Sequence, residues 1–341
     1  MNRKAIALLS GGLDSTLAIL AVLKQGIEVK AKKFRTPFDH AVACGASGSD
    51  PVSLARRFFF DVELCNLGDR FLDVVKNPKH GYGKNMNPCI DCRIFMLKEA
   101  KKSMDMIAAD FIITGEVIGQ RPMSQKKDML YHIDREAGVA GLVLRPLSAK
   151  LLKSTVPEER GMIDREMLYD FSGRSRKPQM RLAAELGLDA YPSPAGGCLL
   201  TEPNYAYRLK DLMTFDSAPS VRDIDLLRVG RHFRPSPLCK IVIGRDEAEN
   251  EIIESAATDT DCLLRVDGCG SPSTLVTGEI NEEAIRLAAS LCARYSDAKK
   301  ILEVQTEVKR GDRTRVLTVS PADNETIEAL RIEKKAVGKT L

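Results

Sequence analysis

The sequence predicts an α/β fold: a doubly wound parallel sheet followed by a smaller C-terminal α+β domain. Short apolar runs at 5–9 and 111–115 alternate with segments whose apolar residues recur at helical spacing. The first apolar run ends in a Ser/Gly turn, and a helix starts directly after that turn. Beyond about residue 204 this alternation gives way to several strands around one long helix.

The N-terminal elements follow one another as strand and helix. Strands are expected at 5–9, 28–34, 61–67 and 111–115, and helices at 13–24, 53–60, 88–102 and 179–187. Pro88 favours a helix start because the first turn tolerates proline. Strands joined through helices lie parallel, so a ligand should bind beyond their carboxyl ends.

We place the domain boundary at 204, which gives domains 1–204 and 205–341. In the second domain we expect strands at 240–244, 262–266 and 275–278, a helix at 281–295 and a final hairpin of 301–308 with 314–319. Asn281 is a suitable cap for the helix. The tail at 334–339 should fray.

Composition points to an ordinary globular chain. Its 341 residues are 44% hydrophobic and 29% charged, with a net charge of +4. We see no signal peptide and no apolar run near the roughly 20 residues of a membrane helix, so we expect a cytoplasmic protein without a membrane partner. In that compartment the nine cysteines should not form structural disulfides. Trp is absent and aromatics are 5%, so base stacking should not dominate RNA binding.

The turn Ser10-Gly11-Gly12-Leu13-Asp14-Ser15 is the strongest functional signal. Glycines let the backbone approach a phosphate, and the helix start presents free N–H groups to it. Ser10 and Ser15 add hydroxyl donors, and Asp14 suits a metal ion or its water. The spacing fits neither a Walker A motif nor Gly-x-Gly-x-x-Gly. The alternative is an ordinary glycine-rich turn.

The turn resembles the PP-loop of the ATP pyrophosphatases. The resemblance implies that the chain binds ATP with Mg²⁺, cleaves it between the α and β phosphates, and adenylates a carbonyl oxygen. Ser10, Gly11, Gly12, Asp14 and Ser15 would then bind the nucleotide, with Asp14 orienting Mg²⁺.

Three cysteines form a second candidate site. Cys89 and Cys92 open the helix at 88–102, where the helix dipole should lower the pKa of a thiol. Cys198 follows a glycine-rich loop. Three thiolates would hold three irons of a [4Fe–4S] cluster and leave one iron open. Zinc would need a fourth ligand, for which His80 is a weak candidate. The alternative is a helix start and a buried loop thiol; we interpret the other cysteines as packing residues.

Further segments resemble the tRNA 4-thiouridine synthase family. They are residues 114–120 (Thr-Gly-Glu-Val-Ile-Gly-Gln), Ser124-Gln125, Leu144-Arg145-Pro146-Leu147 and Lys150. The resemblance covers about residues 4–200 and implies an ATP-dependent tRNA sulfurtransferase that forms AMP and pyrophosphate. Gly115 and Gln120 would line the nucleotide or base side, and Cys89, Cys92 and Cys198, the arrangement of iron–sulfur tRNA thiolases, would handle sulfur. Arg145 and Lys150 fit phosphate contact and salt bridges equally well.

This chain also differs from that family. The first strand begins near residue 4, so we expect no N-terminal RNA-binding module, and we see no rhodanese-like domain. Residues 205–310 resemble the RNA-binding domain of short synthases. We favour 4-thiouridine over 2-thiouridine as product. The sulfur donor, a persulfide carrier or sulfide, stays open, as does the oligomeric state, for which a homodimer is one option.

Two basic segments are candidates for RNA contact. The loop at 172–177 carries three basic residues and no acid, whereas the segment with Arg222, Arg228, Arg231, His232 and Arg234 also contains Asp223 and Asp225. We therefore favour 172–177. Two rival functions remain: an amide-forming PP-loop synthetase, which needs an ammonia source, and a non-catalytic RNA-binding or iron–sulfur protein.

Overall fold

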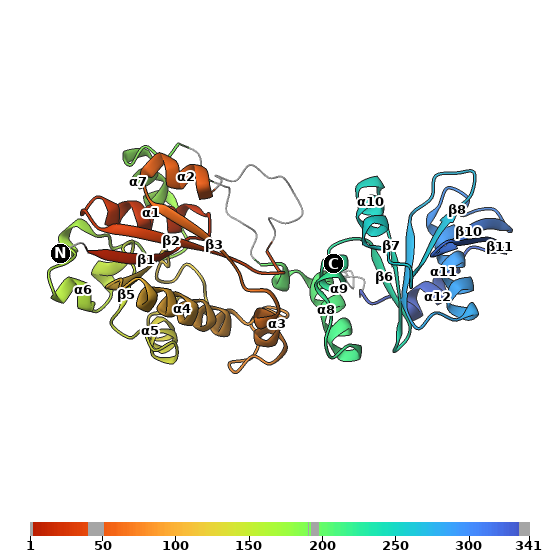
Figure 1. Ribbon diagram of the computed structural model, residues 1–341, viewed down its shortest axis with the longest axis horizontal. Helices are drawn as coiled ribbons and strands as arrows, with labels where there is room; N and C mark the ends of the chain where they lie inside the picture. Colours follow the sequence, from red (N-terminus) through yellow and green to blue (C-terminus); the bar gives the residue numbers. More distant parts are fainter. Residues whose placement is uncertain (1–2, 40–50, 190, 192–197, 334–341) are drawn as a thin grey trace, which may run out of the picture. The chain divides into compact units, whose positions relative to one another are not determined.

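The computed structural model describes residues 3–39, 51–189, 191 and 198–333. The chain divides into two compact units, Met1–Leu199 and Leu200–Leu341, called here the N-terminal and C-terminal units (Figure 1). The division falls a few residues before our expected boundary at 204. Part of the sequence lies outside the described residues. It includes Cys44, most of the segments at 39–50 and 191–197, and the tail at 334–339.

The N-terminal unit is built on a parallel sheet of order β3-β2-β1-β4-β5. Its strands are β1 (Lys4–Leu8), β2 (Glu28–Arg35), β3 (Asp61–Asn66), β4 (Phe111–Thr114) and β5 (Val143–Leu144). β1 pairs in parallel with both β2 and β4. The chain therefore winds outward from β1 in both directions, which confirms the predicted doubly wound sheet. The gap between the carboxyl ends of β1 and β4 is the switch point where such sheets bind ligands.

Helices cover both faces of this sheet (Figure 1). One face carries α1 (Leu13–Leu23), α2 (Pro51–Phe58) and α7 (Lys177–Glu185), and the other α4 (Cys89–Met106) and α5 (Lys127–Glu136). Two shorter helices are α3 (Gly68–Lys76) and α6 (Val156–Glu159).

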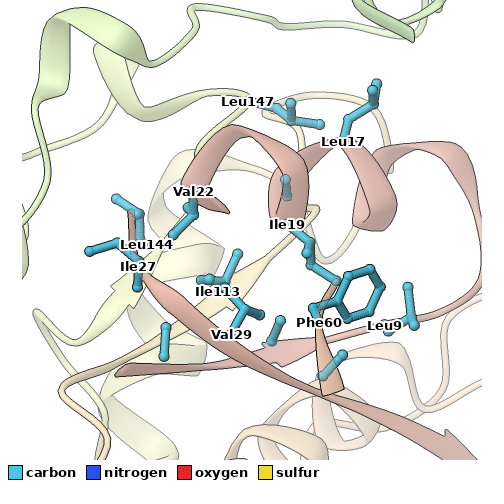
Figure 2. Close-up of a cluster of buried hydrophobic side chains, with 14 of the residues drawn as sticks. Leu9, Leu17, Ile19, Val22, Ile27, Val29, Phe60, Ile113, Leu144 and Leu147 are labelled. Carbon is cyan, nitrogen blue, oxygen red and sulfur yellow. The ribbon is translucent and has the colours of Figure 1, made fainter. Parts of the chain in front are cut away.

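The central strand is apolar from Ala5 to Leu8 because both of its faces are buried there. Ala5 and Ala7 point into the cluster under α1, which Figure 2 shows with Leu17, Ile19 and Val22 of that helix. Ile6 and Leu8 point into the opposite cluster, under α4 and α5. This explains the continuous apolar run in the sequence, which is typical of a strand inside a parallel sheet. The packed strand holds the turn that follows it.

The C-terminal unit is built on an antiparallel sheet of order β11-β10-β8-β9-β7-β6. Its strands are β6 (Arg231–Ser236), β7 (Cys239–Ile243), β8 (Cys262–Val266), β9 (Thr274–Gly278), β10 (Val304–Arg310) and β11 (Arg313–Val319). Its helices are α8 (Pro203–Phe215), α9 (Val221–Leu226), α10 (Glu247–Ala256), α11 (Glu282–Tyr295) and α12 (Asn324–Leu330). α11 and α12 pack on the largest buried cluster of the unit. The predicted α+β domain and its final hairpin are confirmed.

None of the eight cysteines in the described part of the chain forms a disulfide. Cys239, Cys262 and Cys292 are buried, as expected of packing residues, whereas Cys269 is exposed. In the described residues, no helix combines the length and apolar character that crossing a bilayer requires.

Candidate active site

The Ser/Gly turn lies at the carboxyl end of β1 and opens α1. Gly11 has a φ of +83°, a left-handed conformation that favours glycine. The Ser10 backbone N–H donates to Ser15 Oγ at 3.2 Å, and the two hydroxyls lie 3.0 Å apart. In the described residues no side chain caps α1, whose first helical residue follows Gly12. The first-turn N–H groups of α1 are therefore free of a capping oxygen, as an anion site requires.

Asp14 and Gln120 meet beside this turn, although they are far apart in the chain. Gln120 Nε2 donates to Asp14 Oδ2 at 2.9 Å. The other carboxylate oxygen, Asp14 Oδ1, is buried and has no hydrogen-bond partner among the described residues. A buried carboxylate oxygen without a donor is costly unless a ligand completes it. Mg²⁺ prefers oxygen ligands of this kind, so Asp14 fits the metal that the sequence predicts.

Gly115, directly after β4, lies against the backbone of the turn. A Cβ atom at this position would lie 2.5 Å from both Cα and N of Ser15, and 2.6 Å from the carbonyl carbon of Asp14. Only glycine lets the end of β4 come so close to the start of α1. Its proximity to the PP-loop is thus clear, but its nearest neighbours are protein backbone.

Lys33 is a cation of this site that the sequence analysis did not identify. It lies on β2, and its Nζ donates to the carbonyl oxygen of Ser10. Burial lowers the pKa of Lys33, an effect that the carboxylate of Asp39 opposes. Its ammonium also lies 3.4 Å from the position of a Cβ on Gly11, directly beside the turn. The parallel pairing of β1 with β2 brings it there, and local sequence spacing gives no sign of it.

The cysteines lie in the same unit. Cys89 and Cys92 occupy the first turn of α4, and Cys198 Sγ lies 3.8 Å from the carbonyl oxygen of Phe38, just beyond β2. Burial raises the pKa of Cys92 to about 12, and the nearby Cys198 and Cys89 add to this effect. An electrostatic effect of Cys198 thus reaches Cys92, and the convergence of the three sulfur atoms stays a prediction. The expected lowering of the pKa is wrong for Cys92, because burial outweighs both the helix dipole and the neighbouring Arg93.

Within the described ranges, no three His, Cys, Asp or Glu side chains lie close enough to hold a metal ion. Three thiols match an iron–sulfur cluster in chemistry, but their described positions do not form its geometry. Residues 192–197, directly before Cys198, lie outside the described part.

His80 is committed to other partners. Its backbone N–H donates to Asp91 Oδ2 at 2.9 Å, and its Nδ1 lies 2.8 Å from Asp91 Oδ1. Its Nε2 lies 2.9 Å from His132 Nε2 on α5. Asp91 stands between the two cysteines in sequence, so these contacts fix the first turn of α4. They also weaken the suggestion that His80 is a fourth metal ligand.

Comparisons with known proteins agree with this geometry. Residues 1–154 match the family model described as Thiamine biosynthesis protein (ThiI), which confirms the resemblance seen in the sequence. After this match we call residues 1–154 the ThiI-type domain. Residues 230–331 match the model described as NFACT protein RNA binding domain.

Individual relatives match mainly the ThiI-type domain. The tRNA-specific 2-thiouridylase MnmA of Syntrophotalea carbinolica is 29% identical over 124 residues, which cover 33% of this chain and 34% of the relative. A probable tRNA sulfurtransferase of Ureaplasma parvum serovar 3 is 29% identical over 156 residues, which cover 44% of this chain and 37% of the relative. The chain thus spans well under half the length of these curated relatives, so likeness alone does not give its activity.

One solved structure among the matches is a 4-thiouridine synthetase–RNA complex with bound ATP. It is 24% identical with a TM-score of 0.35, and the match covers 55% of this chain and 52% of that chain. The fold described above does not depend on this likeness.

Arg145 of the ThiI-type domain serves the fold rather than a phosphate. It is buried, donates to Asp134 at 2.8 Å through both terminal nitrogens, and donates to Glu116 at 3.0 Å. Burial alone would raise the pKa of Glu116, but Arg145 and Arg93 hold it below its usual value. Lys150 forms a surface ion pair with Glu166 at 3.0 Å. Phosphate contact and salt bridges were the two interpretations for Arg145 and Lys150, and the structure favours salt bridges for both.

The basic loop at 172–177 lies near the PP-loop. The Gly173 N–H donates to the Ile118 carbonyl at 2.7 Å, and Ile118 is two residues before Gln120, which contacts Asp14. Arg174 and Lys177 are exposed. This loop therefore offers free positive charge beside the ThiI-type site.

The basic residues at 222–234 are instead used within the C-terminal unit. Arg222 pairs with Asp261, Arg228 with Asp225, and Arg234 with Asp211. Arg231 lies over the ring of Tyr295, and His232 is buried. They do not form an open cluster for RNA phosphates.

Proposed function

We propose that this chain is an ATP-dependent tRNA sulfurtransferase that adenylates a uridine carbonyl oxygen and replaces it with sulfur. One observation carries the proposal most directly. The N-terminal unit contains both the PP-loop and the thiols of Cys92 and Cys198. In the PP-loop, one carboxylate oxygen of Asp14 is buried without a hydrogen-bond partner among the described residues. ATP activation and sulfur handling thereby occur within one fold. The names of the relatives, a 2-thiouridylase and a probable tRNA sulfurtransferase, support this reaction class.

The adenylation step uses the turn. The uridine oxygen attacks the α-phosphorus of ATP, the bond to the bridging oxygen breaks, and pyrophosphate leaves. We assign the uncapped first turn of α1 and the ammonium of Lys33, which lies beside the turn, to stabilise the negative charge that develops on that leaving group. Mg²⁺, when bound at Asp14, supplies further positive charge.

The second step exchanges oxygen for sulfur. A sulfur nucleophile attacks the activated ring carbon, and AMP leaves with the original carbonyl oxygen. Cys89, Cys92 and Cys198 are the residues we assign to bring sulfur to this point. A [4Fe–4S] cluster held by the three would supply an open iron for the incoming sulfur. A persulfide on one cysteine is the alternative.

The substrate is tRNA in this proposal. The exposed loop at 172–177 and the match of 230–331 to an RNA-binding family model support it. We favour 4-thiouridine as product because the motifs at 114–125 resemble that synthase family. The curated relatives include 2-thiouridylases, so the product must be identified directly.

The proposal is tested by ATP turnover and nucleoside analysis. The purified chain, with a sulfide source and tRNA from a thiouridine-free strain, should form AMP and pyrophosphate only when tRNA is present. Liquid chromatography with mass spectrometry of the digested tRNA should then show thiouridine. The chromatographic retention time of the nucleoside separates 4-thiouridine from 2-thiouridine, which have the same mass. AMP formation that needs an amine acceptor instead would favour the amide-forming synthetase. RNA binding without any ATP turnover would favour the non-catalytic protein.

Cys198 gives a sharper test of the sulfur step. Cys198→Ala should abolish thiouridine formation and leave the dissociation constant for ATP within twofold of wild type, because Cys198 Sγ contacts the carbonyl oxygen of Phe38 and the substitution removes no group that we assign to ATP binding. Cys239→Ala is the matched control, since that thiol is buried in the other unit. Full thiolation by Cys198→Ala would remove the three-cysteine assignment. Iron and sulfide content after anaerobic purification separates the cluster from the persulfide route.

A further inference from the structure

A cleft lies in the C-terminal unit, beside α8. Its volume is about 410 Å³, within the range typical of ligand sites. The cleft is lined by Tyr207, Lys210, Asp211, Thr214 and Phe215 of α8, by Arg234 of β6, and by residues 329–332. The opposite face of α8 carries its buried residues, among them Leu209 and Leu212. The α8 side of the cleft is therefore formed by side chains outside the buried face of that helix.

Two aromatic rings on this face are open to solvent. Tyr207 is 41% exposed and Phe215 is 42% exposed. Eight residues separate them along α8, which places them about 12 Å apart along the helix axis. A single base cannot be sandwiched between rings at that separation, but two successive unpaired bases could each stack on one ring.

Arg234 makes the Phe215 platform rigid. Its guanidinium lies 4.9 Å from the centroid of the Phe215 ring. The edges of the guanidinium donate to Asp211 at 2.5–3.3 Å and to the carbonyl of Pro237 at 3.3 Å. The ring thus rests on a fixed planar cation and keeps its own exposed surface for a ligand. A ring held in place in this way loses little conformational entropy when a base stacks on it.

The charge of the cleft suits a phosphate. Lys210 is exposed and lies between Tyr207 and Phe215 in the sequence of α8. Asp211 is paired with Arg234, and Arg331 is paired with Glu333 at 3.2 Å. The charges of Asp211 and Arg234 cancel, whereas Glu333 is shared between Arg331 and Arg208. The exposed ammonium of Lys210 therefore adds to a net positive charge at the cleft. A phosphate that links two stacked bases would meet it.

We propose that this cleft binds two successive unpaired nucleotides of RNA, with their bases on Tyr207 and Phe215 and the linking phosphate at Lys210. The inference rests on the proposed function only in taking RNA as the ligand. It agrees with the low aromatic content of the chain, because one stacking site needs just these two rings. The cleft binds single strands and excludes duplex RNA, whose bases have no free faces.

The test measures binding of a fluorescein-labelled single-stranded RNA decamer and of a matched RNA duplex by anisotropy, with the full-length chain at several salt concentrations. Phe215→Leu and Tyr207→Leu should each weaken decamer binding at least fivefold, as expected for the loss of one stacked base, with the salt slope unchanged. Phe215→Trp should bind like wild type. Lys210→Ala should reduce the salt slope by about 0.7, the value for one single-strand phosphate contact.

Controls make failure informative. Leu302→Ala removes a side chain that is 83% exposed in the same unit and does not line the cleft, so it should bind as wild type does. Circular dichroism melting confirms that each variant is folded. The inference is overturned if folded Phe215→Leu and Tyr207→Leu bind the decamer like wild type, or if both lose duplex binding to the same extent. Thiolation of tRNA by the wild-type chain reports separately on the proposed function.

Discussion

At the residue scale, sequence motifs identify some of the side chains around the PP-loop but not others. Asp14 belongs to a contiguous motif, and Gln120 to a second motif that resembles the same family. Lys33 belongs to neither, because only the pairing of β1 with β2 brings it to Ser10. Its function is therefore best tested by mutation.

Lys33→Met should weaken binding of a non-hydrolysable ATP analogue about tenfold or more. The variant removes a charged donor beside the phosphate position, and a hydrogen bond to a charged group contributes about 1.5–3 kcal/mol. Isothermal titration calorimetry measures the change. Lys30→Met is the matched control: it removes a half-exposed lysine of the same strand, β2, that pairs with Glu63 of β3. Equal affinities of wild type and Lys33→Met for the ATP analogue would show that the ammonium only stabilises the turn, through its hydrogen bond to Ser10.

Lys240 in the C-terminal unit should lower stability at neutral pH. Burial lowers its pKa from 10.5 to about 8, and the carboxylates of Asp211 and Asp223 offset only part of this effect. Below pH 8 the lysine is protonated in both states, so folding must bury a charge. Between pH 8 and 10.5 the unfolded chain binds more protons than the folded chain, so stability rises with pH.

Lys240→Met should therefore be more stable than wild type by about 1–3 kcal/mol at pH 7, since one unit of pKa shift corresponds to about 1.4 kcal/mol. The gap should narrow as the pH rises from 8 to 10.5. Urea unfolding at a series of pH values measures both effects. A gap that stays constant over this range would mean that burial of the charge is not its cause.

At the element scale, the sequence predicted the helices and strands that have a clear period or a cap. The expected strand at 262–266 and the helix at 281–295 agree with β8 and α11 to within one residue. The sequence patterns did not predict β5, β6 or the helices α3, α5, α6, α8, α9, α10 and α12, whose buried faces depend on distant partners. The contact of Cys198 with Phe38 joins residues 160 positions apart, which no local pattern encodes. Cys198 was identified through its glycine-rich neighbours, whereas the burial of Cys92 comes from packing alone.

Gly115→Ala tests how closely β4 approaches α1. The added Cβ would lie 2.5 Å from backbone atoms of Ser15, and backbone cannot rotate away as a side chain can. The two elements must separate, so the variant should lose ATP-analogue binding at least tenfold and unfold at a lower temperature. Gly138→Ala is the comparison within the same unit, because nothing lies within 4 Å of its Cβ position. That residue has a φ of +70°, so its variant controls for backbone strain without the collision. Normal ATP binding by folded Gly115→Ala would show that the PP-loop tolerates the displacement.

At the scale of the whole molecule, each unit has its own buried core. The N-terminal unit packs helices on both faces of a parallel sheet, and the C-terminal unit packs α11 and α12 on an antiparallel one. The proposed ligands divide in the same way, with ATP in the first unit and unpaired nucleotides in the second. The basic loop at 172–177 is a proposed RNA contact in the unit that holds the PP-loop.

This division predicts that ligands stabilise the two units separately. A ligand that binds only the folded state stabilises it by about 2.7 kcal/mol at 100 times its dissociation constant. For a unit of this size, that corresponds to a rise of roughly 5–10 °C in the unfolding midpoint. Calorimetry of the full chain should show a transition that a non-hydrolysable ATP analogue with Mg²⁺ raises and a second one that it leaves in place. The single-stranded RNA decamer should raise the second transition, and Phe215→Leu should remove that rise while keeping the response to the ATP analogue. A single transition that the ATP analogue moves as a whole would show that the two cores unfold together, and the division of ligands between units would then need structural proof.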